Sequence, residues 1–117
     1  EGRPEKAEAL AEEVLEHARK LDERLAEAVA LARLAHARLV KAKTVGEDGE
    51  VLSLYAQADA LVRSLGMERL RAEMLMGQAL YQSWRGNTPR AYEAAREGVE
   101  IAGALAPPAE IFDQIDL

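Results

Sequence analysis

Apolar residues recur every three or four positions along most of the chain, which is the spacing of one face of an α-helix. Breaks in this pattern predict five helices, at about 4–20, 23–43, 50–64, 68–85 and 89–105. No stretch alternates apolar and polar residues in the manner of a half-buried strand. The sequence therefore predicts an all-α fold, with residues 1–117 in a single domain.

The residues at the predicted helix ends favour these boundaries. Pro4 and Pro89 suit the first turn of a helix, where a backbone N–H is not needed. Asp22 and Thr88 are expected to cap the second and fifth helices through their side-chain oxygens. Gly66 is expected to end the third helix in a left-handed conformation.

Two segments interrupt the helical pattern. Residues 44–49 combine two glycines with acidic residues, and they form the clearest predicted loop. Pro107 and Pro108 break the chain near its end, after which 109–114 is expected to begin a short sixth helix.

The helix expected at 23–43 is apolar on more than one side, so we expect it to pack between two neighbours. Its two apolar stripes are Leu25, Val29, Ala32, His36, Leu39 and Leu31, Leu34, Ala35. His36 is accordingly expected to be a buried, hydrogen-bonded histidine, with contact to a ligand as the alternative.

A weak internal repeat relates the helix ends. Leucines close similar short segments at positions 21, 65 and 105, which are 44 and 40 residues apart. A period of about 35 to 45 residues, filled by two antiparallel helices, is typical of an α-helical solenoid. In this register the chain holds one outer helix, two whole hairpins and the start of another, so we interpret it as a fragment of a longer array.

The second hairpin carries residues of a known repeat pattern. These are Leu75, Ala79, the turn 86–91 (Gly-Asn-Thr-Pro-Arg-Ala), Ala95 and Gly98. Over about 22–105 the chain thus resembles the tetratricopeptide-repeat family, most of all the degenerate repeats of MalT-like and LuxR-type bacterial transcriptional regulators. The resemblance implies antiparallel hairpins stacked as a right-handed solenoid, which would bind an effector and relay this to ATPase and DNA-binding regions elsewhere.

Small residues also recur at helical spacing, independently of any family. They include Ala28, Ala32, Ala58, Gly77, Ala79, Ala91, Ala95 and Gly98. Because two helices approach closely only where side chains leave room, we expect these positions to mark helix contacts.

Composition excludes several classes of function. The chain has no cysteine, which removes disulfides, thiolate chemistry and Cys-ligated metals, and its formal charge of −6 disfavours direct binding of nucleic acid. No window has the length of a membrane-spanning helix or the pattern of a secretory signal, so a cytoplasmic location is the default. His17 and Glu13 share one helix face but are too few for a metal site. We expect no cofactor and no catalysis.

The most distinctive polar cluster lies at the end of the fourth predicted helix. The first helix of each hairpin commonly lines the concave face of such solenoids, and here these are the second and fourth helices. The candidate binding residues are Gln78, Tyr81, Gln82, Trp84, Arg85 and His36. An aromatic pair beside an arginine can anchor a peptide or a flat ligand. The alternative is that Tyr81 and Trp84 only fill the junction between hairpins.

Two functions remain from the sequence, and a small helical enzyme has least support. The first is a noncatalytic interaction or effector-sensing module that binds a protein, a peptide or a small molecule. The second is a scaffold that associates with itself as a homo-oligomer. Its contacts would be the terminal apolar residues Leu10, Val14, Ile111, Phe112 and Ile115.

Overall fold

The computed structural model describes residues 3–45 and 50–105, which form α-helices only. They are α1 (Arg3–Leu21), α2 (Arg24–Val45), α3 (Val51–Leu65), α4 (Glu68–Trp84) and α5 (Thr88–Leu105). The described residues contain no strand, so the all-α prediction is confirmed. Each helix matches an expected one to within about two residues, the largest change being that α2 includes Thr44 and Val45. The expected helix at 109–114 lies outside the described residues.

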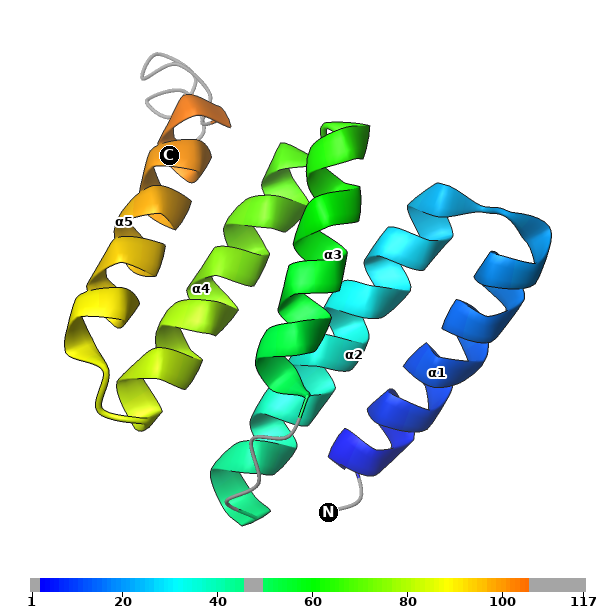
Figure 1. The fold of residues 1–117 in the computed structure, drawn as a ribbon, viewed down its shortest axis with the longest axis horizontal. Helices are drawn as coiled ribbons and strands as arrows, with labels where there is room; N and C mark the ends of the chain where they lie inside the picture. Colours follow the sequence, from blue (N-terminus) through cyan, green and yellow to red (C-terminus); the bar gives the residue numbers. More distant parts are fainter. Residues whose placement is uncertain (1–2, 46–49, 106–117) are drawn as a thin grey trace, which may run out of the picture.

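The helices form two layers of unequal size. In Figure 1, α1, α2, α4 and α5 lie side by side, and α3 lies in front of α2 and α4. The contacts agree with this view, because α2 contacts α1 and α4, α4 contacts α5, and α3 packs on both α2 and α4. The Cα extents are 42 × 38 × 29 Å. One face of the four-helix layer therefore carries α3, and the other carries no helix among the described residues.

Three connections reverse the chain by the same backbone hydrogen bond. The N–H of one residue donates to the carbonyl five positions earlier: Glu23 to Ala18 at 2.9 Å, Met67 to Val62 at 3.0 Å, and Asn87 to Gln82 at 2.8 Å. In each turn the residue before the donor has a positive φ, namely +57° at Asp22, +68° at Gly66 and +80° at Gly86. This is the left-handed helix ending predicted for Gly66.

Two predicted caps require correction. Asp22 lies in the left-handed position that ends α1, and α2 begins only at Arg24, so Asp22 is not the N-cap of α2. Aspartate tolerates this conformation better than most residues with a side chain. At α5 the carbonyl of Asn87 accepts the first helical hydrogen bond from Ala91, at 3.0 Å. The cap position is therefore Asn87, and Thr88 is already the first helical residue.

The hydrophobic core lies between α3 and the four-helix layer. Its largest members include Leu15, Leu31, Leu39, Val51, Tyr55, Val62, Leu70, Met74 and Tyr81, which come from α1, α2, α3 and α4. Helix α5 contributes none of the clustered core residues, and its buried residue is Gly98. Most of the apolar burial is therefore in α1–α4, with α5 attached at the edge.

Two glycines allow the close contacts that the sequence predicts. A Cβ atom on Gly77 would lie 2.3 Å from the Tyr55 hydroxyl oxygen, so the tyrosine of α3 occupies the space that a side chain on α4 would need. A Cβ on Gly98 would lie 3.3 Å from the Leu75 Cβ and the Met76 sulfur, which is where α5 approaches α4. The prediction that Gly77 and Gly98 mark helix contacts is confirmed.

The apolar stripes of α2 are buried only in part. Ala32 and Leu39 are buried, whereas Leu25, Val29 and His36 are exposed. Helices α1, α3 and α4 all pack on α2, and together they leave one arc of its circumference uncovered. The prediction that this helix packs between neighbours is confirmed, and the expectation that His36 is buried is wrong.

Candidate binding surface

Exposed apolar side chains gather on the face of the four-helix layer that is turned away from α3. On α2, Leu25, Val29 and His36 follow helical spacing along one arc, and on α4 Leu80 and Trp84 do the same. We call this surface the open face. Its members are Leu10, Val14 and Leu21 on α1; Leu25, Val29, Arg33 and His36 on α2; Arg69, Glu73, Met76, Leu80 and Trp84 on α4; and Tyr92 and Val99 on α5.

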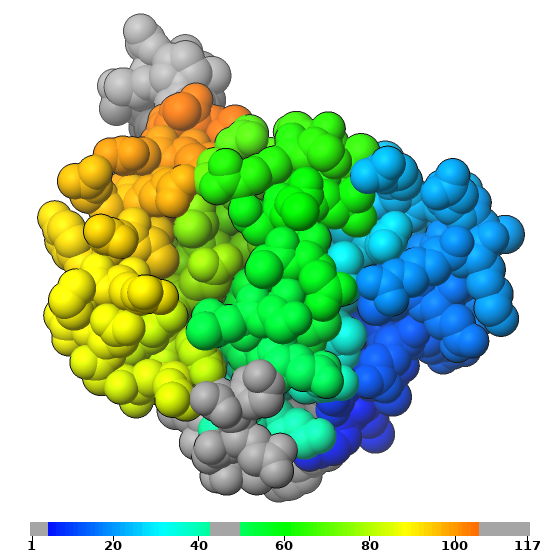
Figure 2. Space-filling view, in the orientation of Figure 1, coloured from blue at the N-terminus to red at the C-terminus, as the bar shows by residue number. Residues whose placement is uncertain are grey.

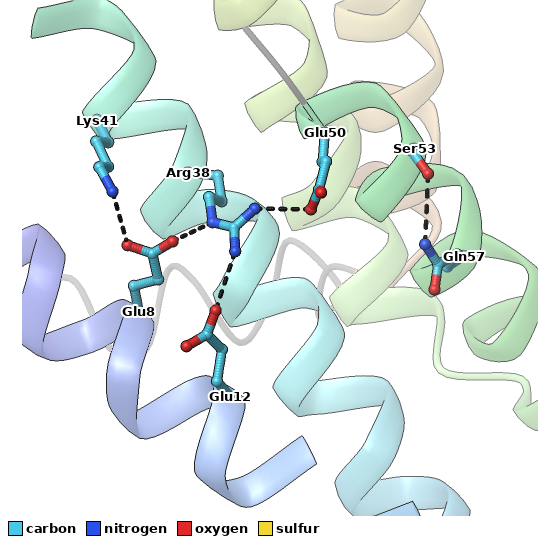
Figure 3. Close-up of polar contacts among 7 residues, drawn as sticks. All are labelled: Glu8, Glu12, Arg38, Lys41, Glu50, Ser53 and Gln57. Carbon is cyan, nitrogen blue, oxygen red and sulfur yellow. Dashed lines mark hydrogen bonds and ion pairs between the residues drawn. The ribbon is translucent and has the colours of Figure 1, made fainter. Parts of the chain in front are cut away.

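The opposite side, around α3, carries most of the ion pairs that join different helices. Figure 3 shows Arg38 of α2 between three carboxylates. Its guanidinium donates to Glu50 before α3 at 2.8 Å, to Glu12 of α1 at 3.0 Å, and also to Glu8 of α1. Lys41 donates to Glu8 at 3.1 Å. This cluster joins α1, α2 and the start of α3.

The charges of this cluster stabilise one another. Burial by itself would raise the pKa of Glu8, but hydrogen bonds from Lys41 and Arg38 outweigh it and hold the pKa below its usual value. Burial likewise opposes the charge on Arg38, and hydrogen bonds to Glu50 and Glu8 raise its pKa in spite of that. With these groups engaged in pairs inside the protein, we assign the cluster a structural role.

A second arginine has the same role at the other end of the layer. Arg71 of α4 has its Nε 3.4 Å from an Asp59 carboxylate oxygen on α3, and it also forms an ion pair with Glu97 of α5. Its side chain is only 11% exposed. The buried Nε has no well-aligned hydrogen bond, so its contact with Asp59 is an ion pair rather than a hydrogen bond.

A small pocket opens between α2 and α4, and we call it the inner pocket. Its volume is about 160 Å³, and its lining residues are Ala32, Arg33, His36, Tyr55, Leu70, Glu73 and Met74. The Arg33 guanidinium lies 3.4 Å from the Glu73 carboxylate across the two helices. Burial raises the pKa of Tyr55 to about 12, so its hydroxyl keeps its proton at neutral pH. Charged and polar groups thus surround an apolar floor.

A hollow of larger volume lies between α4 and α5, and we call it the α4–α5 groove. It measures about 390 Å³ and is lined by Arg69, Ala72, Glu73, Met76, Gly98, Val99, Ala102 and Leu105. Six of these eight residues are apolar or glycine, so the groove is mainly apolar. Glu73 borders both the groove and the inner pocket, which places the two hollows next to each other.

The structure separates the binding residues that the sequence groups together. His36 lines the inner pocket, and Trp84 is 40% exposed on the open face. Tyr81 is buried in the core, with the Arg85 guanidinium 5.7 Å from its ring centre. Gln78 and Gln82 follow Arg71 by seven and eleven positions and share its arc of α4, the side that meets α3. They therefore project away from the arc of Trp84.

Sequence reasoning missed the charged residues of the open face. Arg33 and Glu73 lie 40 positions apart and meet only because α2 and α4 are neighbours. One signal was present, since Arg33 follows Leu25 and Val29 at intervals of four and interrupts an apolar stripe with a charge. Such a stripe marks an exposed arc rather than a buried one.

The predicted self-association residues fall into two groups. Leu10 and Val14 are exposed on the open face, at 62% and 39%. Ile111, Phe112 and Ile115 lie outside the described residues.

Residues 3–45 and 50–105 contain no group of three or more His, Asp or Glu side chains placed to hold a metal ion. No helix within these ranges has both the length and the apolar character needed to cross a membrane. No protein-family model matches the chain, and no curated protein and no solved structure matches it.

Proposed function

We propose that this protein is a noncatalytic interaction module that binds a peptide segment of a partner protein on its open face. The inner pocket carries this proposal, because it brings Arg33, His36 and Glu73 around an apolar floor on a surface rich in exposed apolar side chains. Exposed apolar surface bordered by polar groups is typical of protein interaction sites.

The size of the inner pocket favours a peptide over a free small molecule. Sites for small molecules usually enclose about 300 to 1,000 Å³, and this pocket has about 160 Å³. It suits one apolar side chain of a longer segment, whose neighbouring polar groups would meet Arg33, His36 and Glu73. The exposed apolar residues of α1 and α2 on the open face would contact the rest of the segment.

We further propose that the helices form part of a tetratricopeptide-like, right-handed solenoid, with α2–α3 and α4–α5 as its hairpins. The adjacency of α2 and α4 supports this register, since these first helices of the two hairpins supply both sides of the inner pocket. By the resemblance described above, the parent protein would be a bacterial transcriptional regulator, and the module would sense an effector or partner.

The two histidines provide a matched test. Peptides that bind the full chain are first selected from a displayed random library. Their affinity is then measured through the fluorescence of Trp84, the single tryptophan. His36→Ala should weaken their binding about tenfold, as truncation of a contact residue commonly does. His17→Ala, which removes an exposed histidine of α1, should leave binding unchanged. Equal affinities of the two variants, or a library that yields no binder, would contradict the proposal.

Self-association is the second candidate function, and the exposure of Leu10 and Val14 favours it. An open face that paired with another copy would make the sedimentation coefficient depend on protein concentration. Leu10→Glu should then restore a monomer. A concentration-independent monomer for the unchanged chain would exclude this function.

A further inference from the structure

The α4–α5 groove is a mainly apolar hollow beside the end of α5. Leu105, the last residue of α5, is itself one of the groove residues, and twelve more residues follow it in the sequence. Among the described residues, α5 therefore ends at one end of an apolar groove that no other described helix covers.

The sequence after α5 has the composition expected of a segment that would cover this groove. Ile111, Phe112 and Ile115 have the spacing of one helix face, and Glu110, Asp113 and Asp116 give the segment three negative charges with no positive one. The groove offers Met76, Val99 and Leu105 as apolar contacts, and its border carries Arg69 and Glu73, whose charges are opposite. The apolar side of the segment thus matches the apolar lining of the groove.

The length of the segment also fits. Pro107 and Pro108 favour a break directly after α5, which would let the chain turn back. As a helix, residues 109–117 would span roughly 13 Å at 1.5 Å per residue. The α5 side of the groove runs from Gly98 to Leu105, a shorter distance by the same measure. A returning helix would bring Ile115 close to Val99.

We propose that residues 109–117 bind as an amphipathic helix in the α4–α5 groove of the same molecule, with Ile111, Phe112 and Ile115 against Met76, Val99 and Leu105. This inference does not depend on peptide binding at the inner pocket. Because Glu73 borders both hollows, the bound segment would also form one wall of the surface that a partner meets.

The absence of cysteine makes a disulfide test direct. Val99→Cys and Ile115→Cys are introduced together in the full chain, and disulfide formation under mild oxidation is followed on non-reducing gels. A disulfide requires the two Cα atoms to approach within about 7 Å. We expect a fast intramolecular bond whose rate is independent of protein concentration.

A matched pair controls for a segment that only moves at random. Gln57→Cys lies on an exposed position of α3, on the other side of the four-helix layer, and is combined with the same Ile115→Cys. This pair should close at least about tenfold more slowly, because its Cα atoms would not approach to bonding distance. Equal rates for the two pairs would overturn the proposal.

The remaining outcomes identify other occupants of the groove. A bond between molecules, forming faster at higher protein concentration, would mean that a second copy supplies the segment and would overturn the proposal.

Phe112→Glu should slow the formation of the intramolecular disulfide of the Val99–Ile115 pair about tenfold, which corresponds to about 1.4 kcal/mol. Asp113→Asn, a change on the charged side of the segment, should slow it far less. An equal effect of both changes would argue against docking through the apolar side.

Discussion

The two ends of the four-helix layer are held together in different ways. Helices α1 and α2 join α3 and α4 around a core of large side chains, which includes Leu31, Leu39 and Tyr55. Helix α5 instead approaches α4 through small residues, with Gly98 as its buried position, and keeps Val99 and Leu105 exposed. Figure 2 shows the α3 side of the molecule, where the atoms of α3 lie between those of α1 and those of α5.

This difference shows that close helix contact and deep burial are separate properties. Small residues let α5 lie near α4, yet they remove little apolar area from water, and burial supplies most of the stability of a fold. The α4–α5 hairpin is thus well formed in geometry and only weakly stabilised by burial. Substitutions that probe one property at a time can test this distinction.

The largest expected effect comes from shortening one aliphatic side chain in each region. Leu39→Ala, at a fully buried position of α2, should lower the free energy of unfolding by about 3 kcal/mol. Ile101→Ala, at a partly buried position of α5, should lower it by about 1 kcal/mol, because less apolar area is lost. Urea denaturation followed by circular dichroism measures both. Equal losses would show that α5 contributes to the core as much as α2 does.

A smaller effect is expected from adding one methyl group to a glycine. Gly77→Ala should destabilise the protein by about 2 kcal/mol, because its Cβ would overlap the buried Tyr55 hydroxyl. Gly103→Ala, in α5 with no atom within 4 Å, should instead stabilise it by up to about 1 kcal/mol through helix propensity. Thermal and urea denaturation of both variants give the signs directly.

The tyrosine supplies the control for this prediction. In a Tyr55→Phe background the hydroxyl oxygen is gone and the nearest ring carbon would be 3.1 Å from the new Cβ. Gly77→Ala should then lower the free energy of unfolding clearly less than it does in the unchanged protein. A cost that stays the same would mean that the clash with Tyr55 is not its cause.

The smallest expected effect is a pH dependence confined to the core region. Burial raises the pKa of Tyr55 to about 12, above the value of about 10 expected in the unfolded chain. The resulting stability is complete below pH 10 and is lost as the pH rises toward 12, because the unfolded state releases the proton first. Between pH 9 and pH 11 the loss should be about 1 kcal/mol.

Denaturation at these two pH values checks this prediction. Tyr55→Phe should remove the loss of stability between pH 9 and pH 11 that comes from the Tyr55 hydroxyl. Tyr92→Phe, which removes an exposed phenol of α5, should leave the loss unchanged. If the two variants behave alike, the pH dependence has another source.

The sequence predicts the helices well because their signals are local. The spacing of apolar residues and the glycine at position 66 each act within one helix or one turn, and the structure agrees with both. Asp22 shows the limit of this reasoning, since aspartate suits both a helix N-cap and a left-handed turn, and only the backbone hydrogen bond of Glu23 to Ala18 distinguishes them.

The candidate site was harder to predict because it depends on which helices are neighbours. His36 lies on an apolar stripe and therefore resembles a core residue, but no helix covers its arc of α2 among the described residues. Arg33 and Glu73 form the border of one pocket only after α2 and α4 have packed together. Periodicity within one helix contains no information about that packing.

The uniform turns also have a consequence for the folding pathway. Three of the reversals close within a few residues, and short loops lose little entropy on closing, so the α1–α2, α3–α4 and α4–α5 pairs can form early and independently. The Arg33–Glu73 contact spans 40 residues and must form later. We therefore expect the inner pocket to be among the last features to form, so that a nascent chain completes this pocket only after α4 has been synthesised.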